Sequence, residues 1–174
     1  SSLEPALRAT LGQLLLLEGQ TAEAAREFSW VIDAVEGGEL AMSVRYGLAE
    51  AQRAQQRFAV AGELYAEFAT AYPRSQKGQR ALLLAGDCAL YAGRSEQAVE
   101  RYRELLDRYP DSVYRDDAMY RLGTALQRAG RPDAAREPLV SLVQSTSDYR
   151  ARALGRLGAI ERGRGDLTAA VEAY

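Results

Sequence analysis

The sequence predicts an all-α protein, a right-handed superhelical solenoid of about five antiparallel helix-turn-helix repeats. The first observation is a phrase that recurs along the 174 residues: a Leu-Gly or similar small pair, a Gly about seven residues on, an Ala five residues later, and then an aromatic residue or Leu. The second observation is its period, because the Ala recurs at steps of 37, 37, 37 and 35, at Ala24, Ala61, Ala98, Ala135 and Ala170. Chance does not hold such a register over five copies, so we expect stacked helix pairs that share one continuous core.

The period divides one domain, residues 1–174, into units at approximately 5–41, 42–78, 79–115, 116–150 and 151–174. Each unit is expected to form a first helix (helix A), a turn and a second helix (helix B). The last unit is incomplete, because Tyr174 falls in the middle of its expected helix B. We therefore expect either a longer protein or a second molecule to cover the apolar residues of that end, Leu154, Leu157 and Leu167.

The small pair of each unit lies midway along helix A, where Gly or Ala allows helix B to cross closely. Its copies are Leu11-Gly12, Leu48-Ala49, Ala85-Gly86, Leu122-Gly123 and Leu157-Gly158. The recurrent Ala of helix B is expected to be the opposing small contact. The spacing between helices is therefore predicted to be set by small residues.

Helix ends are also predicted from the sequence. Four glycines fall where helix A must stop, in the left-handed conformation that side chains disfavour: Gly19, Gly93, Gly130 and Gly165. Gln56 occupies this position in the second unit and is an exception. Pro132 suits the first turn of a helix, and Pro73 and Pro110 follow second helices. Pro138 lies inside the fourth helix B, where the lost hydrogen bond to the carbonyl of Ala134 predicts a bend over 134–138.

These residues resemble the tetratricopeptide repeat, which has a Leu-Gly pair in helix A, Gly at the turn, Ala-x-x-x-aromatic in helix B and a closing Pro. The resemblance covers residues 5–174, and three steps of 37 exceed the family's usual period of about 34. It implies a repeat scaffold with no catalytic residues to carry over. Proteins of this family serve many unrelated partners, so the resemblance favours a fold more strongly than a function.

A finer resemblance depends on two segments, Tyr-Pro-Arg-Ser at 72–75 and Tyr-Pro-Asp-Ser at 109–112. These closers are similar to those of bacterial cell-envelope tetratricopeptide proteins, namely the periplasmic Tol-Pal-associated protein and the lipoprotein that assists outer-membrane assembly. The first and fourth units lack the Pro. The resemblance implies a role in envelope assembly and favours the periplasm or cell envelope, with the cytoplasm left open.

Composition argues against an enzyme. The absence of His excludes Ser-His-Asp and Cys-His nucleophilic schemes and His metal sites. Cys88 is the only Cys, so no intrachain disulfide or Cys cluster for zinc can form, and we expect it to pack as a small residue of helix A. The acidic residues Glu50, Asp87, Asp116 and Asp117 are interpreted as ion-pair partners of nearby Arg residues. We therefore predict no catalysis, no cofactor and no metal.

Charge and hydropathy limit the partners. The net charge of −2 gives no footprint for nucleic acid. The longest purely apolar run, Leu14 to Leu17, is far shorter than the ~20 residues that span a bilayer. We therefore predict a protein or peptide partner, no nucleic acid and no direct membrane insertion. Residues 1–41 carry seven acids against two Arg, an acidic end that either orients a partner or is a solvated face.

The family resemblance implies a concave groove lined by defined positions of the A helices. The matching candidates for partner binding are Tyr46, Glu50, Arg53, Leu83, Asp87, Tyr91, Tyr120, Thr124 and Arg128. Further positions of the same kind include Gln13, Ser43, Arg80, Gln127 and Arg152. Aromatic and Leu anchors beside charged groups suit a peptide or helix held by apolar contacts and oriented by polar ones. Leu83 has an equal interpretation as a core residue, whereas Tyr46, Tyr91 and Tyr120 are expected to be exposed.

The sequence therefore predicts a non-enzymatic protein-interaction scaffold that binds a peptide or helical segment, or that self-associates through its C-terminal repeat. The alternative is a regulatory or substrate-recruiting region of a larger enzyme or secretion machine. The clamp that some tetratricopeptide domains use for a C-terminal carboxylate is not expected, because its key positions here are Gln13, Glu50, Asp87, Thr124 and Ala159.

Overall fold

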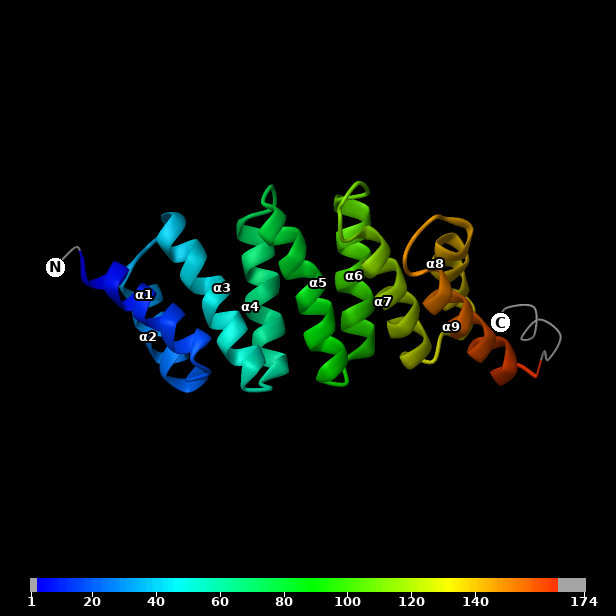
Figure 1. Cartoon of the computed structure of the whole chain (residues 1–174), viewed down its shortest axis with the longest axis horizontal. Helices are drawn as coiled ribbons and strands as arrows, with labels where there is room; N and C mark the ends of the chain where they lie inside the picture. Colours follow the sequence, from blue (N-terminus) through cyan, green and yellow to red (C-terminus); the bar gives the residue numbers. More distant parts are fainter. Residues whose placement is uncertain (1–2, 166–174) are drawn as a thin grey trace. The chain divides into compact units, whose positions relative to one another are not determined.

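The structure, a computed structural model, describes residues 3–165 (Figure 1). Within that range the chain forms only α-helices: α1 (Glu4–Leu17), α2 (Thr21–Ala34), α3 (Gly38–Ala54), α4 (Phe58–Ala71), α5 (Gln76–Tyr91), α6 (Ser95–Arg108), α7 (Arg115–Arg128), α8 (Pro132–Gln144) and α9 (Arg150–Gly163). Odd-numbered helices are the predicted A helices and even-numbered helices the B helices. The expected helix B of the fifth unit lies outside the described residues.

The chain divides into two compact units, residues 1–92 with α1 to α5 and residues 93–174 with α6 to α9. In the first, each helix packs on the next along the chain, and α1 also contacts α3. In the second, α6 packs on α7, α7 on α8 and α8 on α9. Within each compact unit, an internal helix B therefore lies between the helix A of its own repeat and that of the next, as in a solenoid.

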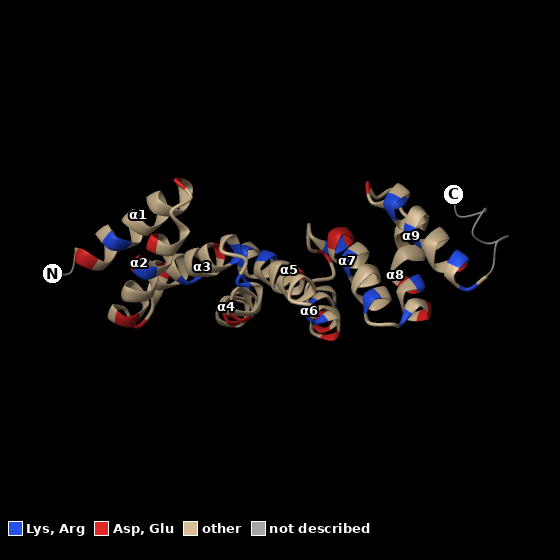
Figure 2. Cartoon of the chain, turned by 90° about the horizontal axis from the view of Figure 1, so that it is seen from below, with Lys and Arg blue, Asp and Glu red and all other residues tan. Residues whose placement is uncertain are grey.

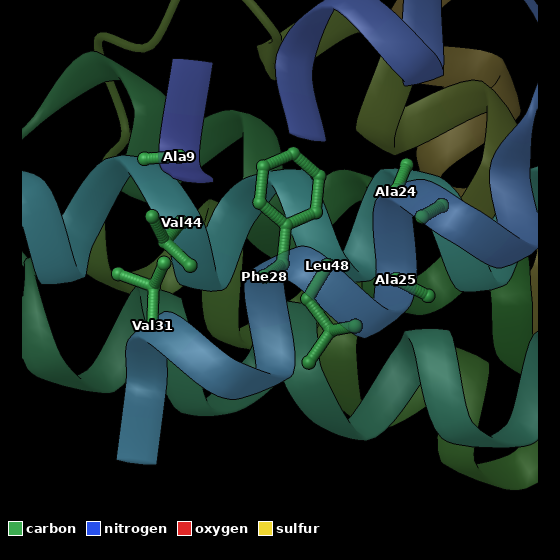
Figure 3. Packing of buried hydrophobic residues seen from close by; sticks show 8 residues of the cluster. Ala9, Ala24, Ala25, Phe28, Val31, Val44 and Leu48 are labelled. Atoms are coloured by element: carbon green, nitrogen blue, oxygen red, sulfur yellow. The ribbon is translucent and has the colours of Figure 1, made fainter. Parts of the chain in front are cut away.

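The core of the first compact unit is built around Phe28 of α2, which is fully buried together with Ala24 and Val31 (Figure 3). A Cβ atom placed on Gly12 of α1 or on Gly47 of α3 would come within 2.7 Å of the Phe28 ring. The ring is therefore held between glycines of two successive A helices.

This packing corrects one detail of the sequence prediction. The nearest neighbours of Gly12 are atoms of Phe28, four residues after the recurrent Ala, rather than Ala24 itself. In the second compact unit Gly123 likewise faces Leu139, at 2.8 Å from an added Cβ. The glycine makes room for the bulky residue of helix B, while the recurrent Ala24, Ala61, Ala98 and Ala135 are all fully buried.

The predicted ends of the A helices are confirmed. The four glycines have φ between 74° and 80°, and Gln56 adopts the same left-handed conformation with a φ of 59°. The turn after α3 is closed by hydrogen bonds from Gln56 N to Arg53 O (2.9 Å) and from Arg57 N to Gln52 O (2.9 Å), the same pair that closes α1 and α7. Gln56 is therefore an exception in residue type but not in backbone conformation.

The Ser of the Tyr-Pro-x-Ser segments has a structural function that the sequence analysis did not assign. Ser75 is the N-cap of α5, and its Oγ accepts a hydrogen bond from Gly78 N at 2.9 Å. Ser112 Oγ accepts from Tyr114 N at 3.1 Å, and Ser147 Oγ accepts from Tyr149 N at 3.2 Å. The segments that link helix B to the next helix A are thus ordered by serine side chains, including the link without Pro.

Pro138 is buried inside α8, which continues as one helix from Pro132 to Gln144. The helix is therefore not broken at Pro138, and the bend over 134–138 stays a prediction.

The prediction of an uncovered apolar C-terminal end is wrong for Leu157. Leu157 of α9 is only 8% exposed, because it occupies the side of a helix A that packs against the preceding helix B, here α8. Leu154 is partly buried, and Leu167 lies outside the described residues.

Candidate partner-binding face

The A helices of the first compact unit carry a hydrogen-bonded group formed by Glu50, Arg53 and Tyr65. The Tyr65 hydroxyl, which reaches across from α4, donates to Glu50 Oε1 at 2.7 Å. Arg53 Nη2 donates to Glu50 Oε2 at 2.8 Å, and Arg53 Nε donates to the Tyr65 hydroxyl at 3.3 Å. The predicted site residues Glu50 and Arg53 are therefore brought together, but they are tied to the core of the unit rather than held free for a partner.

The pKa values follow from this arrangement. Burial acts to raise the pKa of Glu50, but the hydrogen bonds from Arg53 and Tyr65 outweigh it and lower the pKa below its usual value of 4.5. Burial and the bond to Glu50 raise the pKa of Tyr65, while the bond to Glu50 raises the pKa of Arg53 against the opposing effect of burial. Glu50 is thus ionised and Tyr65 neutral at neutral pH, which suits an orienting group and not a proton-transfer pair.

Tyr46 of α3 is half-buried, which corrects the expectation of an exposed ring. Its ring makes edge contacts with Tyr65 (centroids 5.6 Å apart) and Phe68 (5.2 Å), and the Lys77 ammonium lies 5.8 Å from its centroid. Aromatic packing of this kind buries the faces that a partner would otherwise use. Tyr46 is therefore a packing residue beneath the surface of the A helices and not a residue that a partner contacts directly.

Leu83 of α5 is also a core residue, with 5% of its surface exposed, so the interpretation as a packing residue is the correct one. Asp87, on the same helix, is half-buried. Tyr91 confirms its expected exposure at 71%, and its ring stacks on Phe58 with centroids 5.0 Å apart. In this compact unit the accessible side chains of the predicted set are thus Arg53 and Tyr91.

Further polar residues lie on the A helices α1, α3 and α5 of this compact unit. Gln13 Nε2 donates to Ser43 Oγ at 3.1 Å, which joins the A helices α1 and α3 on their solvent side. Arg80 of α5 is exposed and contributes to lowering the pKa of Glu50, so its positive charge lies near that carboxylate. The A helices of the first compact unit therefore offer the exposed side chains of Arg53, Arg80 and Tyr91 beside a hydrogen-bonded polar group.

The second compact unit carries an aromatic and arginine cluster, formed by Tyr120, Tyr149, Arg152 and Arg156. The rings of Tyr120 and Tyr149 lie 5.5 Å apart, with the Arg156 guanidinium over Tyr120 and that of Arg152 over Tyr149. Tyr120 is half-buried, which corrects the expectation of an exposed ring. Arg156 also donates to the Tyr120 hydroxyl at 3.2 Å and to Gln127 Oε1 at 2.9 Å. Guanidinium groups stacked on tyrosine rings form a preorganised surface for acidic or aromatic side chains.

The remaining predicted residues lie on α7, around this cluster. Thr124 is half-buried, and its hydroxyl donates to the carbonyl of Tyr120 at 3.0 Å, so it has a local role in the helix. Arg128 is exposed in the last turn of α7, a helix that begins with acidic residues, the order that the helix dipole favours (Figure 2). Asp117 and Arg121 form a bidentate pair with bonds of 2.6 and 3.0 Å.

Three residues of these clusters were not among the predicted site residues. Tyr65 occupies the position of a buried aromatic residue in helix B. Its hydroxyl could have indicated a polar cluster, because a buried tyrosine hydroxyl needs a hydrogen-bond partner. Arg156 stands four residues after Arg152, so both lie on one side of α9. Tyr149 belongs to the link before α9, and its placement against Tyr120 depends on packing between α7 and α9, which sequence spacing does not reveal.

The other candidate groups do not form a chemical site. Burial raises the pKa of Cys88 to about 11, and the thiol is fully buried, consistent with the expected packing role. Within residues 3–165, no group of His, Cys, Asp and Glu side chains could hold a metal ion. No helix in the same range is long and apolar enough to cross a membrane.

A cavity of about 610 Å³ lies between α6, α7 and α8 and was not predicted. Its apolar lining includes Leu106, Met119, Leu126 and Pro138. Charges of both signs stand around it, so it offers no single electrostatic preference.

Comparisons with known proteins agree with this architecture. The family model described as Tetratricopeptide repeat matches residues 10–75, 83–149 and 120–174. No curated protein matches the chain. Among solved structures, MamA from Desulfovibrio magneticus RS-1 is similar with a TM-score of 0.78, 16% identity and coverage of 98% of this chain and 90% of that chain.

Two other solved structures are similar. One holds the nearly identical TPR-like repeats of a Podosopora anserina putative kinesin light chain, with a TM-score of 0.72, 18% identity and coverage of 97% and 90%. The other is YrrB, described as a TPR protein with an unusual peptide-binding site, with a TM-score of 0.72, 14% identity and coverage of 95% and 80%. At these identities the likeness establishes the fold, and it confirms the predicted all-α solenoid of helix pairs.

Proposed function

The chain belongs to the tetratricopeptide repeat family, and we propose that it is a non-enzymatic scaffold that binds a peptide or helical segment of a protein partner on its A helices. The observation that supports this proposal best is the cluster of Tyr120, Tyr149, Arg152 and Arg156. Tyr and Arg are the residue types that dominate binding energy at protein interfaces. Here the rings and guanidinium groups already contact one another without a partner, and such preorganisation reduces the entropic cost of binding.

The proposed partner segment carries acidic and aromatic side chains. Arg152 is exposed above the Tyr149 ring, and in the first compact unit Arg53, Arg80 and Tyr91 are exposed on the A helices. An acidic side chain can bind these guanidinium groups, and an aromatic side chain can pack on the tyrosine rings. The similarity to YrrB is in keeping with a peptide ligand, although it extends to the fold alone.

A place in the bacterial cell envelope is part of the same proposal. Its support is the pair of Tyr-Pro-x-Ser segments at 72–75 and 109–112, whose serines order the links into α5 and α7. A scaffold that assembles envelope proteins would hold their extended segments without altering them chemically. Self-association of the chain through its C-terminal repeat belongs to this proposal as well.

The proposal is tested with a phage-displayed peptide library panned on the purified chain. Affinities of the enriched peptides are then measured by fluorescence anisotropy on the wild type and on the double variant Arg80→Glu, Arg152→Glu. Both residues are exposed on A helices, so the variant should remain folded. It should bind at least ~10-fold more weakly, since a lost hydrogen bond to a charged group costs about 1.5–3 kcal/mol.

The matched control is Arg103→Glu, which reverses an exposed charge on the B helix α6. Its affinity for the peptides should equal that of the wild type. Enriched peptides that bind the double variant as tightly as the wild type, or that respond only to the control substitution, would contradict a binding surface on the A helices.

A further inference from the structure

The cavity of the second compact unit lies in a groove that two successive B helices form over the helix A between them. Helix α7 packs on both α6 and α8, and it contributes Arg115, Met119, Leu122 and Leu126 to the lining. These residues are four, three and four positions apart, so they lie along one side of α7. At 1.5 Å per residue, this floor is about 16 Å long. The floor and both walls belong to the described repeats, so the groove is complete on each side.

The first compact unit has a groove at the same repeat positions. A smaller cavity of about 260 Å³ lies between α2, α3 and α4. Two periods of 37 residues after each of its lining residues stands a residue that lines the larger cavity. For example, Ile32 corresponds to Leu106 and Asp33 to Asp107. The groove is therefore a product of the repeat, and its size depends on the residues of each unit.

The larger volume of the second groove comes from small residues on α8. Three lining residues of α8 have smaller side chains than their equivalents in α4: Ala134, Pro138 and Ser141 stand where α4 has Val60, Leu64 and Glu67. This wall therefore recedes from the floor. The second groove has room for side chains for which the first has less space.

The shape of the larger cavity favours a row of side chains as its occupant. A volume of about 610 Å³ over a length of about 16 Å gives a mean cross-section of about 38 Å². An α-helix with its side chains is about 10 Å across, so the cavity accepts the side chains of a helix on its rim but not the helix itself. The rim residues Arg103, Asp107, Pro110 and Glu137 are exposed, whereas pockets for small molecules enclose most of the ligand.

The charges at the rim define the polar side of such a helix. Arg115 forms an ion pair with Asp116 at 3.2 Å. In the part of the chain that the structure describes, Arg103, Asp107 and Glu137 form no ion pair. Arg103 and Asp107 are four residues apart on the α6 wall, and Glu137 is on the α8 wall. One guanidinium and two carboxylates therefore remain available to a partner.

We propose that the groove between α6 and α8 binds an amphipathic α-helix of another protein that carries charges of both signs beside its apolar residues. Large apolar side chains, one in each turn, fill the cavity over α7. An acidic side chain pairs with Arg103, and Lys or Arg side chains pair with Asp107 and Glu137. This surface is separate from the proposed peptide site, because its walls are B helices and the aromatic and arginine cluster is on α7, α9 and the link between α8 and α9.

The test uses a phage-displayed library of helical peptides of about 14 residues, panned on the purified chain. Leu is fixed at i, i+4, i+7 and i+11, the spacing of the α7 floor, and the other positions vary among the helix formers Ala, Gln, Lys, Arg and Glu. The affinities of the enriched peptides are measured by fluorescence anisotropy on the wild type and on two groove variants. The enriched peptides should contain both acidic and basic residues.

The cavity-filling variant Ala134→Val, Pro138→Leu gives α8 the residues that α4 has at the same positions. Leucine also restores the N–H that proline lacks inside a helix, so the variant should remain folded, as checked by circular dichroism and urea unfolding. Its larger side chains occupy the volume that the apolar residues of the partner need. The enriched peptides should therefore bind it at least ~10-fold more weakly.

The charge-exchange variant Arg103→Asp, Asp107→Arg keeps the net charge and reverses the charge pattern of the α6 wall. It places the acidic residue nearer the N-terminus of α6, the order that the helix dipole favours, so the fold should be retained. The enriched peptides should again bind at least ~10-fold more weakly. The matched control is Glu100→Lys, which reverses an exposed charge of α6 outside the cavity lining and should leave the affinity unchanged.

Failure to enrich any helical peptide would overturn the proposal, as would equal affinities for the wild type and either groove variant. Enriched peptides whose charges are all of one sign would overturn it as well. Sedimentation velocity tests a second copy as the occupant: a dimer that the cavity-filling variant dissociates, in a chain that enriches no peptide, would assign the groove to self-association and overturn the proposal. The groove peptides should bind the double variant Arg80→Glu, Arg152→Glu normally, so this proposal and that of the A-helix site fail independently.

Discussion

The Phe28 ring lies so close to Gly12 that a Cβ atom on this glycine would stand 2.7 Å from the ring, closer than such atoms approach in proteins. Gly47 of the next helix A restricts the ring in the same way, also at 2.7 Å. Phe28 is fully buried between them, so a shift of its ring would disturb the core packed around it. The joint between the first two repeats is thus a large ring enclosed by two glycines.

Gly12→Ala should therefore destabilise the protein. The added methyl group overpacks a filled core, and the expected loss is about 1–3 kcal/mol in the free energy of unfolding. Trp30, the only Trp, lies under the Arg8 guanidinium at 4.3 Å, so its fluorescence reports on unfolding of the region around α1 and α2 in urea. The control is Gly155→Ala in α9, where an added Cβ meets nothing within 4 Å and Ala is the better helix former. If the two substitutions change the urea midpoint equally, the packing of the Phe28 ring does not require glycine at position 12.

Gln56→Gly should stabilise the protein. Gln56 has a φ of 59°, in the region that costs a side chain about 1–2 kcal/mol and costs glycine nothing. Glycine also loses about 0.5–1 kcal/mol through its freer unfolded chain, so we expect a net gain of about 0.5 kcal/mol. Urea unfolding followed by circular dichroism measures the change. Gly130→Ala, at the same turn position of the fourth unit with open space around its Cβ, should lower stability instead. A loss of stability in Gln56→Gly would mean that the Gln side chain makes a contribution larger than the strain.

Tyr65→Phe should weaken the protein at neutral pH by about 1 kcal/mol, because Glu50 loses a hydrogen bond of 2.7 Å in a partly buried site. The pKa of Glu50 is lower in the folded protein than its usual 4.5, so the group contributes stability above about pH 4.5 and loses it as the pH falls through the lower folded pKa. The difference between wild type and variant should therefore shrink as the pH falls below 4.5 and through the lower pKa of Glu50 in the folded protein.

Carbon-13 NMR of labelled Glu side chains should also show a higher pKa for Glu50 in this variant. Tyr91→Phe is the control, since Tyr91 is largely exposed, and it should change neither the stability nor the Glu50 titration. If the pKa of Glu50 is the same in the wild type and in Tyr65→Phe, the Tyr65 hydroxyl does not contribute to lowering that pKa.

Most of the fold could be predicted from the repeat period. Residues that recur every 37 positions adopt the same backbone conformation, so the left-handed turns and the buried Ala positions could be assigned from the sequence alone. The candidate site was predicted less well, because its residues are the ones that vary between units. Tyr46 and Tyr91 were both expected to be exposed residues of the groove, yet Tyr46 is half-buried against Tyr65 and Phe68 while Tyr91 is 71% exposed.

The sequence by itself determined the helix pairs, their ends and the absence of histidine chemistry, because these depend on local conformation and residue type. Only the tertiary structure placed Phe28 between two glycines, joined Tyr65 to Glu50, and gathered Tyr120, Tyr149 and Arg156 from different elements. It also showed that Leu7, Leu11 and Leu14 of α1 are exposed whereas Val44, Leu48 and Ala51, one period later in α3, are buried. Burial and side-chain contact depend on which helix lies alongside, and that is a property of the packed chain rather than of any one repeat.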